Sequence, residues 1–353
     1  MEFGLQFFPN VGPDERSAEA YWSDALHLTG LADELGYTTV RTVEHYFHPY
    51  GGYSPDPIVF LAAASQRTRT ARLVTGAVLP IFNNPLKLAG QIGMLDAISG
   101  GRLAVGFARA FLPHEFARFG RALDESRARF EEGVEQVRRL LEDENVSIQG
   151  RFHSFQNVTS LPRPTQKPRP PFYVAALNTE ESFVWAGRHG HAIMAIPMGG
   201  GKLRELLSAY RDARRASSVP GRGTVMLAFH MFCHENANEA ARIAREPLNR
   251  YLQSLSGAAS DWTGGARSED YPGYDKIIAG LAKQSFEAQV ASRSAWVGSP
   301  AQIVEQIRDY VVEAGEFEHA SLQVNFNTIE AEASMRLFAR EVMPHFRQSA
   351  RRA

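Results

Sequence analysis

Short strand-like runs and helix-like segments alternate along almost the whole of this chain of 353 residues. Eight runs are rich in apolar and β-branched residues, and segments with helical apolar spacing lie between most of them. The predicted strands cover residues 3–8, 38–43, 73–80, 102–109, 172–176, 191–196, 224–233 and 320–326. The predicted helices cover residues 18–35, 56–65, 85–98, 123–141, 180–188, 203–216, 237–252, 300–314 and 330–346.

This alternation predicts a closed (β/α)8 TIM barrel, a single α/β domain that spans residues 1–353. Parallel strands need a helical crossover between them, and eight such units along one chain are typical of a barrel. A doubly wound open sheet is the alternative fold, but it usually has fewer strands and a glycine-rich first turn. The first turn here, Pro9–Pro13, is not a dinucleotide-binding fingerprint.

Two segments interrupt the alternation. Residues 143–171 become rich in proline toward their end, which predicts an extended strap rather than a domain boundary. Residues 254–285 combine several glycines with Trp262, Tyr271 and Tyr274. A loop of that length in a compact barrel is either a lid or disordered, and the aromatic residues favour a mobile lid inserted after the seventh strand–helix unit.

Composition excludes several classes of protein. The 38 Lys and Arg residues balance 39 Asp and Glu residues, so the chain lacks the overall positive field of nucleic-acid binders. A single cysteine, Cys233, cannot form an intramolecular disulfide and is consistent with a reducing compartment. No run approaches the roughly 18 apolar residues of a membrane span, and the first residues do not form a secretory signal. We therefore expect a cytoplasmic protein that binds neither nucleic acid nor membrane.

Two residues at the carboxyl ends of predicted strands are candidates for chemistry. Arg109 ends the fourth strand, at the edge where parallel sheets hold their ligands, and its guanidinium suits a phosphate or carboxylate. An ion pair between helices is an equally good explanation of Arg109. His45 ends the second strand on the same rim and could act as a general acid or base, although a lone histidine is more often structural.

Other polar groups are weaker candidates. Asn178 and Ser182 follow the fifth strand and open a helix, so that with Arg109 they could hold an anion, or Asn178 could be an ordinary N-cap. Met198–Lys202 lacks the spacing of a phosphate loop and favours a flexible turn. Glu44, His45 and His48 cannot simply converge on a metal, because adjacent strand residues point to opposite faces. We expect no metal site.

Motifs along nearly the whole chain resemble those of the bacterial luciferase-like, flavin-dependent monooxygenases. No motif is decisive alone, but their order and spacing are specific. They cover residues 43–47, 76–80, 95–109, 175–183, 185–190, 297–300 and 338–346.

The resemblance implies an enzyme that binds reduced FMN (FMNH2) from a separate flavin reductase and activates O2 as a flavin hydroperoxide to oxygenate an organic substrate. It gives His45 a catalytic role beside the flavin, and it implies a non-prolyl cis peptide at Thr75–Gly76. The residues that it implies for cofactor binding are Arg109, Asn178 and Ser182 at the phosphate, Gly76 and Ala77 against the isoalloxazine ring, and Ala175, Met194 and Ile196 on the apolar floor.

Two positions depart from luciferase. The cysteine that precedes the phosphate arginine there is Ala108 here, and the histidine after the catalytic one is Tyr46, which argues against aldehyde-oxidising luminescence. Four aromatic residues could line a site for a bulky or aromatic substrate, although packing explains phenylalanines equally well. They are Phe8, Tyr46, Phe47 and Phe111.

The resemblance leaves two other functions open, a deazaflavin-dependent hydride-transfer oxidoreductase and a non-catalytic flavin-binding partner subunit. It also implies a homodimer that meets at the helices of residues 56–65 and 85–98. Their small and apolar faces could equally pack on the barrel. These faces carry Ala62, Ala63, Ala64, Leu88, Ala89 and Ile92.

Overall fold

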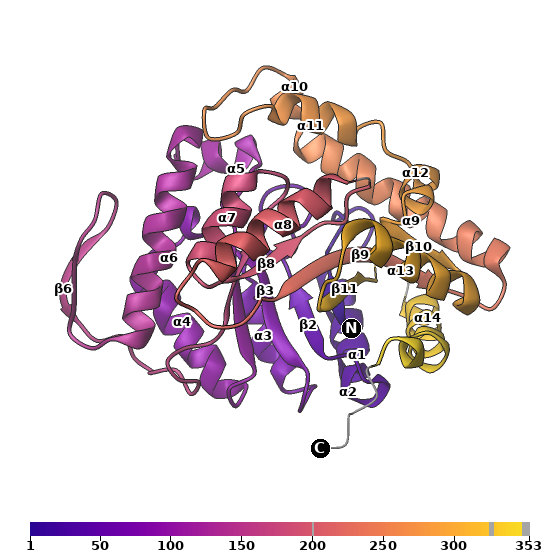
Figure 1. Cartoon of the computed structure of the whole chain (residues 1–353), viewed down its shortest axis with the longest axis horizontal. Helices are drawn as coiled ribbons and strands as arrows, with labels where there is room; N and C mark the ends of the chain where they lie inside the picture. Colours follow the sequence, from indigo (N-terminus) through magenta and orange to yellow (C-terminus); the bar gives the residue numbers. More distant parts are fainter. Residues whose placement is uncertain (200, 325–327, 348–353) are drawn as a thin grey trace.

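A ring of eight parallel strands forms the centre of the protein, and helices surround it (Figure 1). The computed structural model describes residues 1–199, 201–324 and 328–347. The ring closes because β11 pairs with β1 and β9, and β8 pairs with β9. The predicted (β/α)8 barrel is therefore confirmed. The strands of the ring are β1 (Glu2–Phe7), β2 (Thr39–Thr42), β3 (Arg72–Val78), β4 (Leu103–Phe107), β7 (Phe172–Ala175), β8 (Ala192–Ala195), β9 (Val225–Cys233) and β11 (His319–Gln323).

One further strand, β10 (Ala295–Gly298), was not predicted, because it is only four residues long and ends in a glycine. It pairs with the second half of β9, from His230 to Cys233. His230 also pairs with Gln323 of β11. One residue cannot pair with two strands on the same edge, so β10 and β11 lie on opposite edges of β9. β10 therefore lies on the same edge of β9 as β8, beyond the point where β8 ends.

The helices begin where the sequence places capping residues. Ser17, Asp56 and Asn84 accept hydrogen bonds at the first turns of α1, α3 and α4, and Ser299 forms a capping box at α13. The helix predicted over 18–35 is divided at Leu31, and the one predicted over 237–252 continues to Ala258. The helices of the strand–helix units are α1 (Ala18–Gly30), α2 (Ala32–Leu35), α3 (Pro57–Ser65), α4 (Pro85–Ile98), α6 (Ser126–Glu142), α7 (Glu180–Arg188), α8 (Lys202–Arg215), α9 (Ala237–Ala258), α13 (Pro300–Ala314) and α14 (Thr328–Glu341).

Two layers of apolar side chains stabilise the barrel. The larger lies between the strands and the surrounding helices. The smaller contains alternate residues of the strands and fills the lower interior of the ring. Above this plug the inward positions carry small residues such as Gly76 and Ala175, so a cavity remains at the carboxyl ends of the strands. The plug consists of Val74, Ala104, Tyr173, Met194 and Met226.

The strap at residues 143–171 contains a hairpin that projects from the barrel, formed by β5 (Val146–Gln149) and β6 (Ser154–Val158) (Figure 1). Its proline-rich end returns across α4. A Cβ atom on Gly93 would lie 2.1 Å from the carbonyl oxygen of Pro162, so only glycine permits this contact. The strap therefore belongs to the barrel domain, as its sequence predicts.

The segment predicted as a long loop, residues 254–285, is largely helical, which corrects that prediction. It contains the end of α9, then α10 (Ser260–Thr263) and α11 (Tyr274–Leu281), and α12 (Phe286–Ala291) follows. Its many glycines and the absence of long apolar periodicity obscured these short helices. In Figure 1 the segment lies across the upper end of the molecule, above α5 (Pro113–Arg118). We call it the lid segment.

Candidate active site

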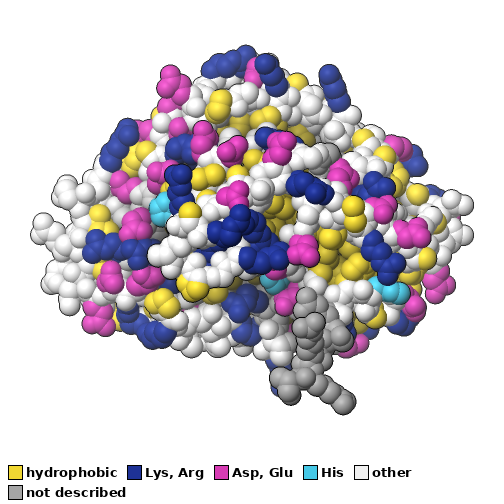
Figure 2. All heavy atoms as spheres, viewed as in Figure 1, with side chains coloured by type: hydrophobic (Ala, Val, Ile, Leu, Met, Phe, Trp, Pro, Cys, Tyr) yellow, Lys and Arg dark blue, Asp and Glu magenta, His cyan; other side chains and the backbone are white. Residues whose placement is uncertain are grey.

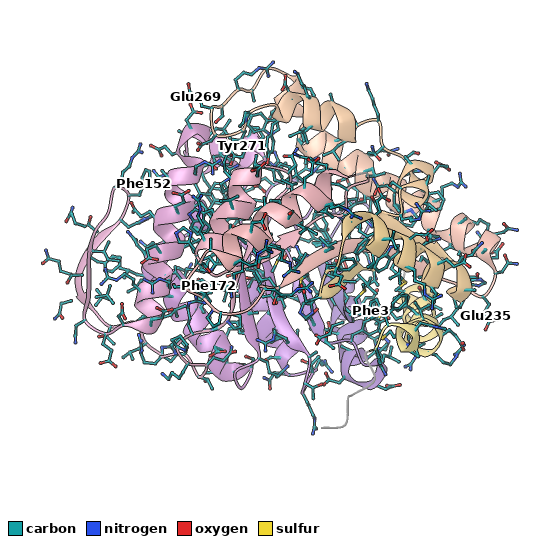
Figure 3. All side chains as sticks on the ribbon, in the orientation of Figure 1. Phe3, Phe152, Phe172, Glu235, Glu269 and Tyr271 are labelled. Atoms are coloured by element: carbon teal, nitrogen blue, oxygen red, sulfur yellow. The ribbon has the colours of Figure 1, made fainter. Side chains whose placement is uncertain are left out.

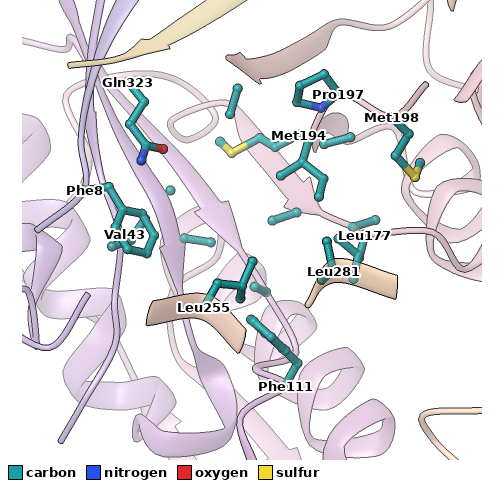
Figure 4. Close-up of a pocket in the computed structure, with 18 of the residues that line it drawn as sticks. Phe8, Val43, Phe111, Leu177, Met194, Pro197, Met198, Leu255, Leu281 and Gln323 are labelled. Carbon is teal, nitrogen blue, oxygen red and sulfur yellow. The ribbon is translucent and has the colours of Figure 1, made fainter. Parts of the chain in front are cut away.

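A cavity of about 680 Å³ lies where the barrel strands end, beneath the lid segment (Figure 4). Its volume is that of a site for a small molecule or cofactor. Side chains from the strand ends form its wall, including Phe8, Val43 and Met194. Leu255, Tyr274 and Leu281 of the lid segment close it from above.

Most of the residues predicted for the site line this one cavity, although nothing in the structure tests their roles. Arg109, Gly76 and Ala77 share it with His45, so the residues that the rule of strand ends places on one rim do line one cavity. The predicted residues that line it are Phe8, His45, Gly76, Ala77, Arg109, Phe111, Ala175, Ser182, Met194 and Ile196.

Three predicted residues do not line the cavity. Phe47 has a left-handed backbone with φ of 63°, and its ring, 55% exposed, packs on Arg118 at the surface. The hydroxyl of Tyr46 donates to Glu44. Asn178 does not line the cavity, whereas its neighbour Thr179 does. The chain leaves the regular strand after Thr42 and after Ala175, and strand alternation no longer predicts which way the following side chains point.

The non-prolyl cis peptide lies at Gly76–Ala77, one residue later than predicted. The prediction of Thr75–Gly76 was therefore wrong by one residue, although it named the correct strand, β3.

His45 is held by a buried carboxylate that the sequence did not reveal. Its Nδ1 atom lies 3.1 Å from Oε1 of Glu115, a residue of α5 with no exposed surface. The same oxygen accepts the backbone N–H of Tyr46 at 2.9 Å. Because an ionised carboxylate can only accept, a neutral His45 carries its proton on Nδ1 and leaves Nε2 as an acceptor. This arrangement of base and orienting carboxylate suits general acid–base catalysis.

Glu44, next to His45, forms a buried link between β2 and the end of β3. Its carboxylate accepts hydrogen bonds from the Tyr46 hydroxyl, the backbone N–H of Leu79 and the side-chain amide of Asn83. Burial raises the pKa of Glu44 to about 8, and the three hydrogen bonds oppose this rise only in part. Glu44 is therefore a buried carboxyl group of raised pKa that joins the end of β2 to the chain after β3.

We expect this raised pKa to make stability depend on pH. The folded protein binds a proton at Glu44 that the unfolded chain releases near its ordinary value of 4.5, so stability falls as the pH rises from there through about 8. As the pH rises from 4.5 to about 8, the melting temperature of the wild type should fall relative to that of Glu44→Gln, because glutamine stays neutral. A difference that is constant from pH 5 to pH 8.5 would contradict the assignment.

The opposite end of the cavity offers donors for a phosphate. Arg109 lines the cavity together with Thr179 and Ser182, whose hydroxyl oxygens are 3.0 Å apart at the first turn of α7. Thr179 is the N-cap residue and its side chain makes no capping bond, so the start of α7 could offer backbone N–H groups to an anion. Ala77, Ala175 and Ile196 provide apolar surface next to these donors. This donor set fits the phosphate and ring of a flavin mononucleotide.

The lid segment is docked onto the chain that carries Arg109. The Arg109 guanidinium donates to the carbonyl oxygen of Asp270 at 3.1 Å and lies over the ring of Tyr271. Tyr271 donates to the carbonyl oxygen of Ala110, and Trp262 donates to that of Phe111 at 2.7 Å. Figure 3 shows Tyr271 turned toward the body of the protein, whereas Glu269 points outward. The lid segment thus covers both the predicted phosphate site and His45.

Whether the lid segment moves remains a prediction, and limited proteolysis tests it. The glycine-rich connection between α10 and α11, residues 264–273, is exposed over much of its length and is the expected site of cleavage within 254–285. Flavin and substrate should protect it, because they bind beneath the lid segment. Cleavage that is equally fast with and without ligands would show that the segment does not respond to the site.

The sequence profile described as luciferase-like monooxygenase matches residues 1–316. The crystal structure of monooxygenase RslO1 from Streptomyces bottropensis is 44% identical, covers 98% of this chain and 100% of its own, and superposes with a TM-score of 0.87. The oxygenase component of a flavin-dependent trigonelline monooxygenase from Acinetobacter baylyi is 26% identical over 99% of this chain and 96% of its own. An F420-dependent glucose-6-phosphate dehydrogenase from Intrasporangium calvum is 28% identical over 80% and 84%.

Within residues 1–199, 201–324 and 328–347, no three His, Cys, Asp or Glu side chains cluster as metal ligands would. Over the same residues, no helix has both the length and the apolar character needed to cross a bilayer. On the face that Figure 2 shows, acidic and basic side chains are interspersed.

Proposed function

This chain belongs to the luciferase-like monooxygenase family, and from that premise we propose that it is a flavin-dependent monooxygenase that uses reduced FMN and O2 to insert one oxygen atom into an organic substrate. The observation that carries the proposal is the His45–Glu115 pair in the same covered cavity as the phosphate donors at Arg109, Thr179 and Ser182. Reduced FMN, when bound, would supply the electrons that activate oxygen.

Different residues of the chain would have different roles in this reaction. Arg109, Thr179 and Ser182 bind the phosphate, and the apolar wall packs against the flavin ring. Nε2 of His45 takes or returns a proton, while Glu115 keeps the imidazole in one orientation and tautomer. The lid segment excludes water, which would otherwise divert a reactive oxygen species.

We propose that a separate flavin reductase supplies the reduced cofactor. The relative from Acinetobacter is itself an oxygenase component, which supports a two-component arrangement. The first turn of this barrel also lacks a nicotinamide fingerprint. The reducing, cytoplasmic location expected from the sequence is compatible with such a partner.

Two alternatives make different predictions for cofactor binding. The F420-dependent relative supports a deazaflavin-dependent hydride transfer, and a non-catalytic flavin-binding subunit would need no His45–Glu115 pair. The test is to titrate the protein anaerobically with reduced FMN and with reduced F420, and then to admit oxygen. We expect preference for FMN and a slower return of oxidised-FMN absorbance than with free flavin. Preference for F420 would favour hydride transfer, and oxidation as fast as that of free FMN would favour the non-catalytic subunit.

We also propose a homodimer through α3 and α4, in part through residues other than those that the sequence suggested. Leu88, Ala89 and Ile92 are fully buried against the barrel and cannot form an interface. Large apolar side chains on the same two helices are instead exposed, namely Val59 of α3 and Leu86, Met94 and Ile98 of α4. Light scattering at micromolar concentration should give twice the mass of one chain, and Val59→Glu with Met94→Glu should give one. A wild-type monomer would refute the dimer.

A further inference from the structure

Three polar side chains lie deep in the cavity on three neighbouring strands. Gln6, Arg41 and Gln323 belong to β1, β2 and β11, and each is less than a tenth exposed, at 4%, 7% and 3%. All three line the cavity, and Figure 4 shows Gln323 directed into it near Phe8. We call them the floor donors. Most of the surrounding wall is apolar, so their burial needs an explanation.

The hydrogen bonds between the floor donors run in one direction. Arginine can only donate, and Nη1 of Arg41 lies 2.9 Å from Gln6, which identifies that atom as Oε1. The amide nitrogen of Gln6 therefore donates to Oε1 of Gln323, at 3.2 Å. The end of the chain is an N–H group, Nε2 of Gln323. Neither this group nor Nε of Arg41 has a partner among the described residues.

The positive charge of Arg41 is also uncompensated. Its other terminal nitrogen donates to the carbonyl oxygen of Gly76, and in the described part of the chain no ion pair joins it to a carboxylate. Burial lowers the pKa of Arg41 to about 10, so the group is still charged at neutral pH. A Cβ atom on Gly76 would lie 1.9 Å from Nε of Arg41, which shows how closely the side chain is fitted beneath β3. The structure thus holds a buried cation and two free donors without an acceptor.

The floor donors lie opposite the phosphate donors. In the ring order β11-β1-β2-β3-β4-β7-β8-β9, strand β1 is four places from β7 in either direction. Arg109 follows β4, and Thr179 and Ser182 follow β7. If the flavin phosphate bound there, the floor donors would lie across the ring of strands from it, on the side that we take for the substrate. His45 follows β2, the strand that carries Arg41, so the substrate side also contains the proposed base.

We propose that the floor donors bind an acidic oxygen of the substrate, either a carboxylate or the ionised hydroxyl of a phenol or enol. This inference rests on the proposed function, because it takes the flavin phosphate to lie at Arg109. An anionic oxygen would neutralise Arg41 and accept from both free N–H groups. Phe8, Tyr50 and Phe111 surround His45 above them, which suits an aromatic or otherwise apolar body. The substrate class is therefore an apolar, aromatic-sized molecule with one acidic oxygen.

Binding of two isosteric probes to the flavin-free protein tests this proposal. Isothermal titration should show that 2-naphthoate binds at least tenfold more tightly than the neutral 2-naphthamide. Arg41→Met, which keeps most of the side-chain volume, should reduce this preference to less than twofold. Gln323→Leu should weaken 2-naphthoate several-fold and leave 2-naphthamide unchanged. Arg121→Ala is the control, because it removes an exposed cation that does not line the cavity, and it should keep the preference.

The outcomes separate this proposal from the proposed function. Equal affinity of the wild type for the two probes, or a preference that survives Arg41→Met, would overturn the substrate site whichever flavin the protein uses. An FMN affinity that falls in Arg41→Met as much as the naphthoate affinity would assign the floor donors to the flavin ring and would also overturn it. Thermal melts followed by circular dichroism check that each variant is folded. If Arg41→Met does not fold, Gln323→Leu decides the matter alone.

Discussion

Replacement of His45 by alanine should reduce product formation by roughly 10²–10⁴-fold, the usual effect of removing a positioned acid or base. FMN affinity should stay within a few-fold, because the phosphate donors follow other strands of the barrel. The pH profile of turnover should also lose one limb. Turnover, its pH profile and FMN binding should be measured on the same preparation of protein.

Glu115 provides a companion to this variant. Glu115→Gln keeps the shape of the side chain but replaces the carboxylate at Nδ1 of His45 by an amide. We expect a smaller loss of turnover than for His45→Ala, with a displaced limb in the pH profile. A merely structural carboxylate would change the melting temperature without moving that limb.

His27→Ala is the control, since His27 is an exposed histidine on α1 outside the cavity. It should have normal turnover. If His45→Ala also retains near-normal turnover, or if it binds no FMN although it remains folded, His45 is not the proposed acid or base. The His45–Glu115 pair would then be a structural contact between β2 and α5.

Arg109→Ala should weaken FMN by roughly 10- to 150-fold, because a charge-assisted hydrogen bond to a phosphate contributes about 1.5–3 kcal/mol. Riboflavin, which lacks the phosphate, should lose less than twofold. Fluorescence titration with the two flavins measures this difference directly. Arg121→Ala is the matched control, because Arg121 is an exposed arginine near the same rim that does not line the cavity.

Arg109 also contacts the lid segment, and this gives the experiment a second possible result. Its guanidinium donates to Asp270 and lies over Tyr271, so Arg109→Ala could loosen the lid segment. In that case FMN and riboflavin would weaken equally, and proteolysis within residues 264–273 would become faster. Equal weakening would therefore reassign Arg109 from the phosphate to the lid segment.

Local pattern was enough to predict the barrel. Strand and helix periodicity depend on residues close together in the chain, and capping residues such as Asp56 and Asn84 begin helices at the predicted positions. The same logic located Arg109 and His45, because the carboxyl ends of all parallel strands meet on one rim. The same reasoning did not predict the short helices of the lid segment. Packing of Trp262 and Tyr271 stabilises them, and their sequence has no long apolar periodicity.

By itself, therefore, the sequence determined the order of the strands of the ring, the helices between them and the rim on which Arg109 and His45 lie. The tertiary structure alone decided the partners within that site. Glu115 meets His45 across 70 residues of chain, and Gln6 meets Gln323 across 317. Irregular turns sent Phe47 to the surface and brought Thr179 to the cavity. Closure of the ring supplies the physical reason, because it brings residues from distant strands into one buried space, where each polar group requires a specific partner.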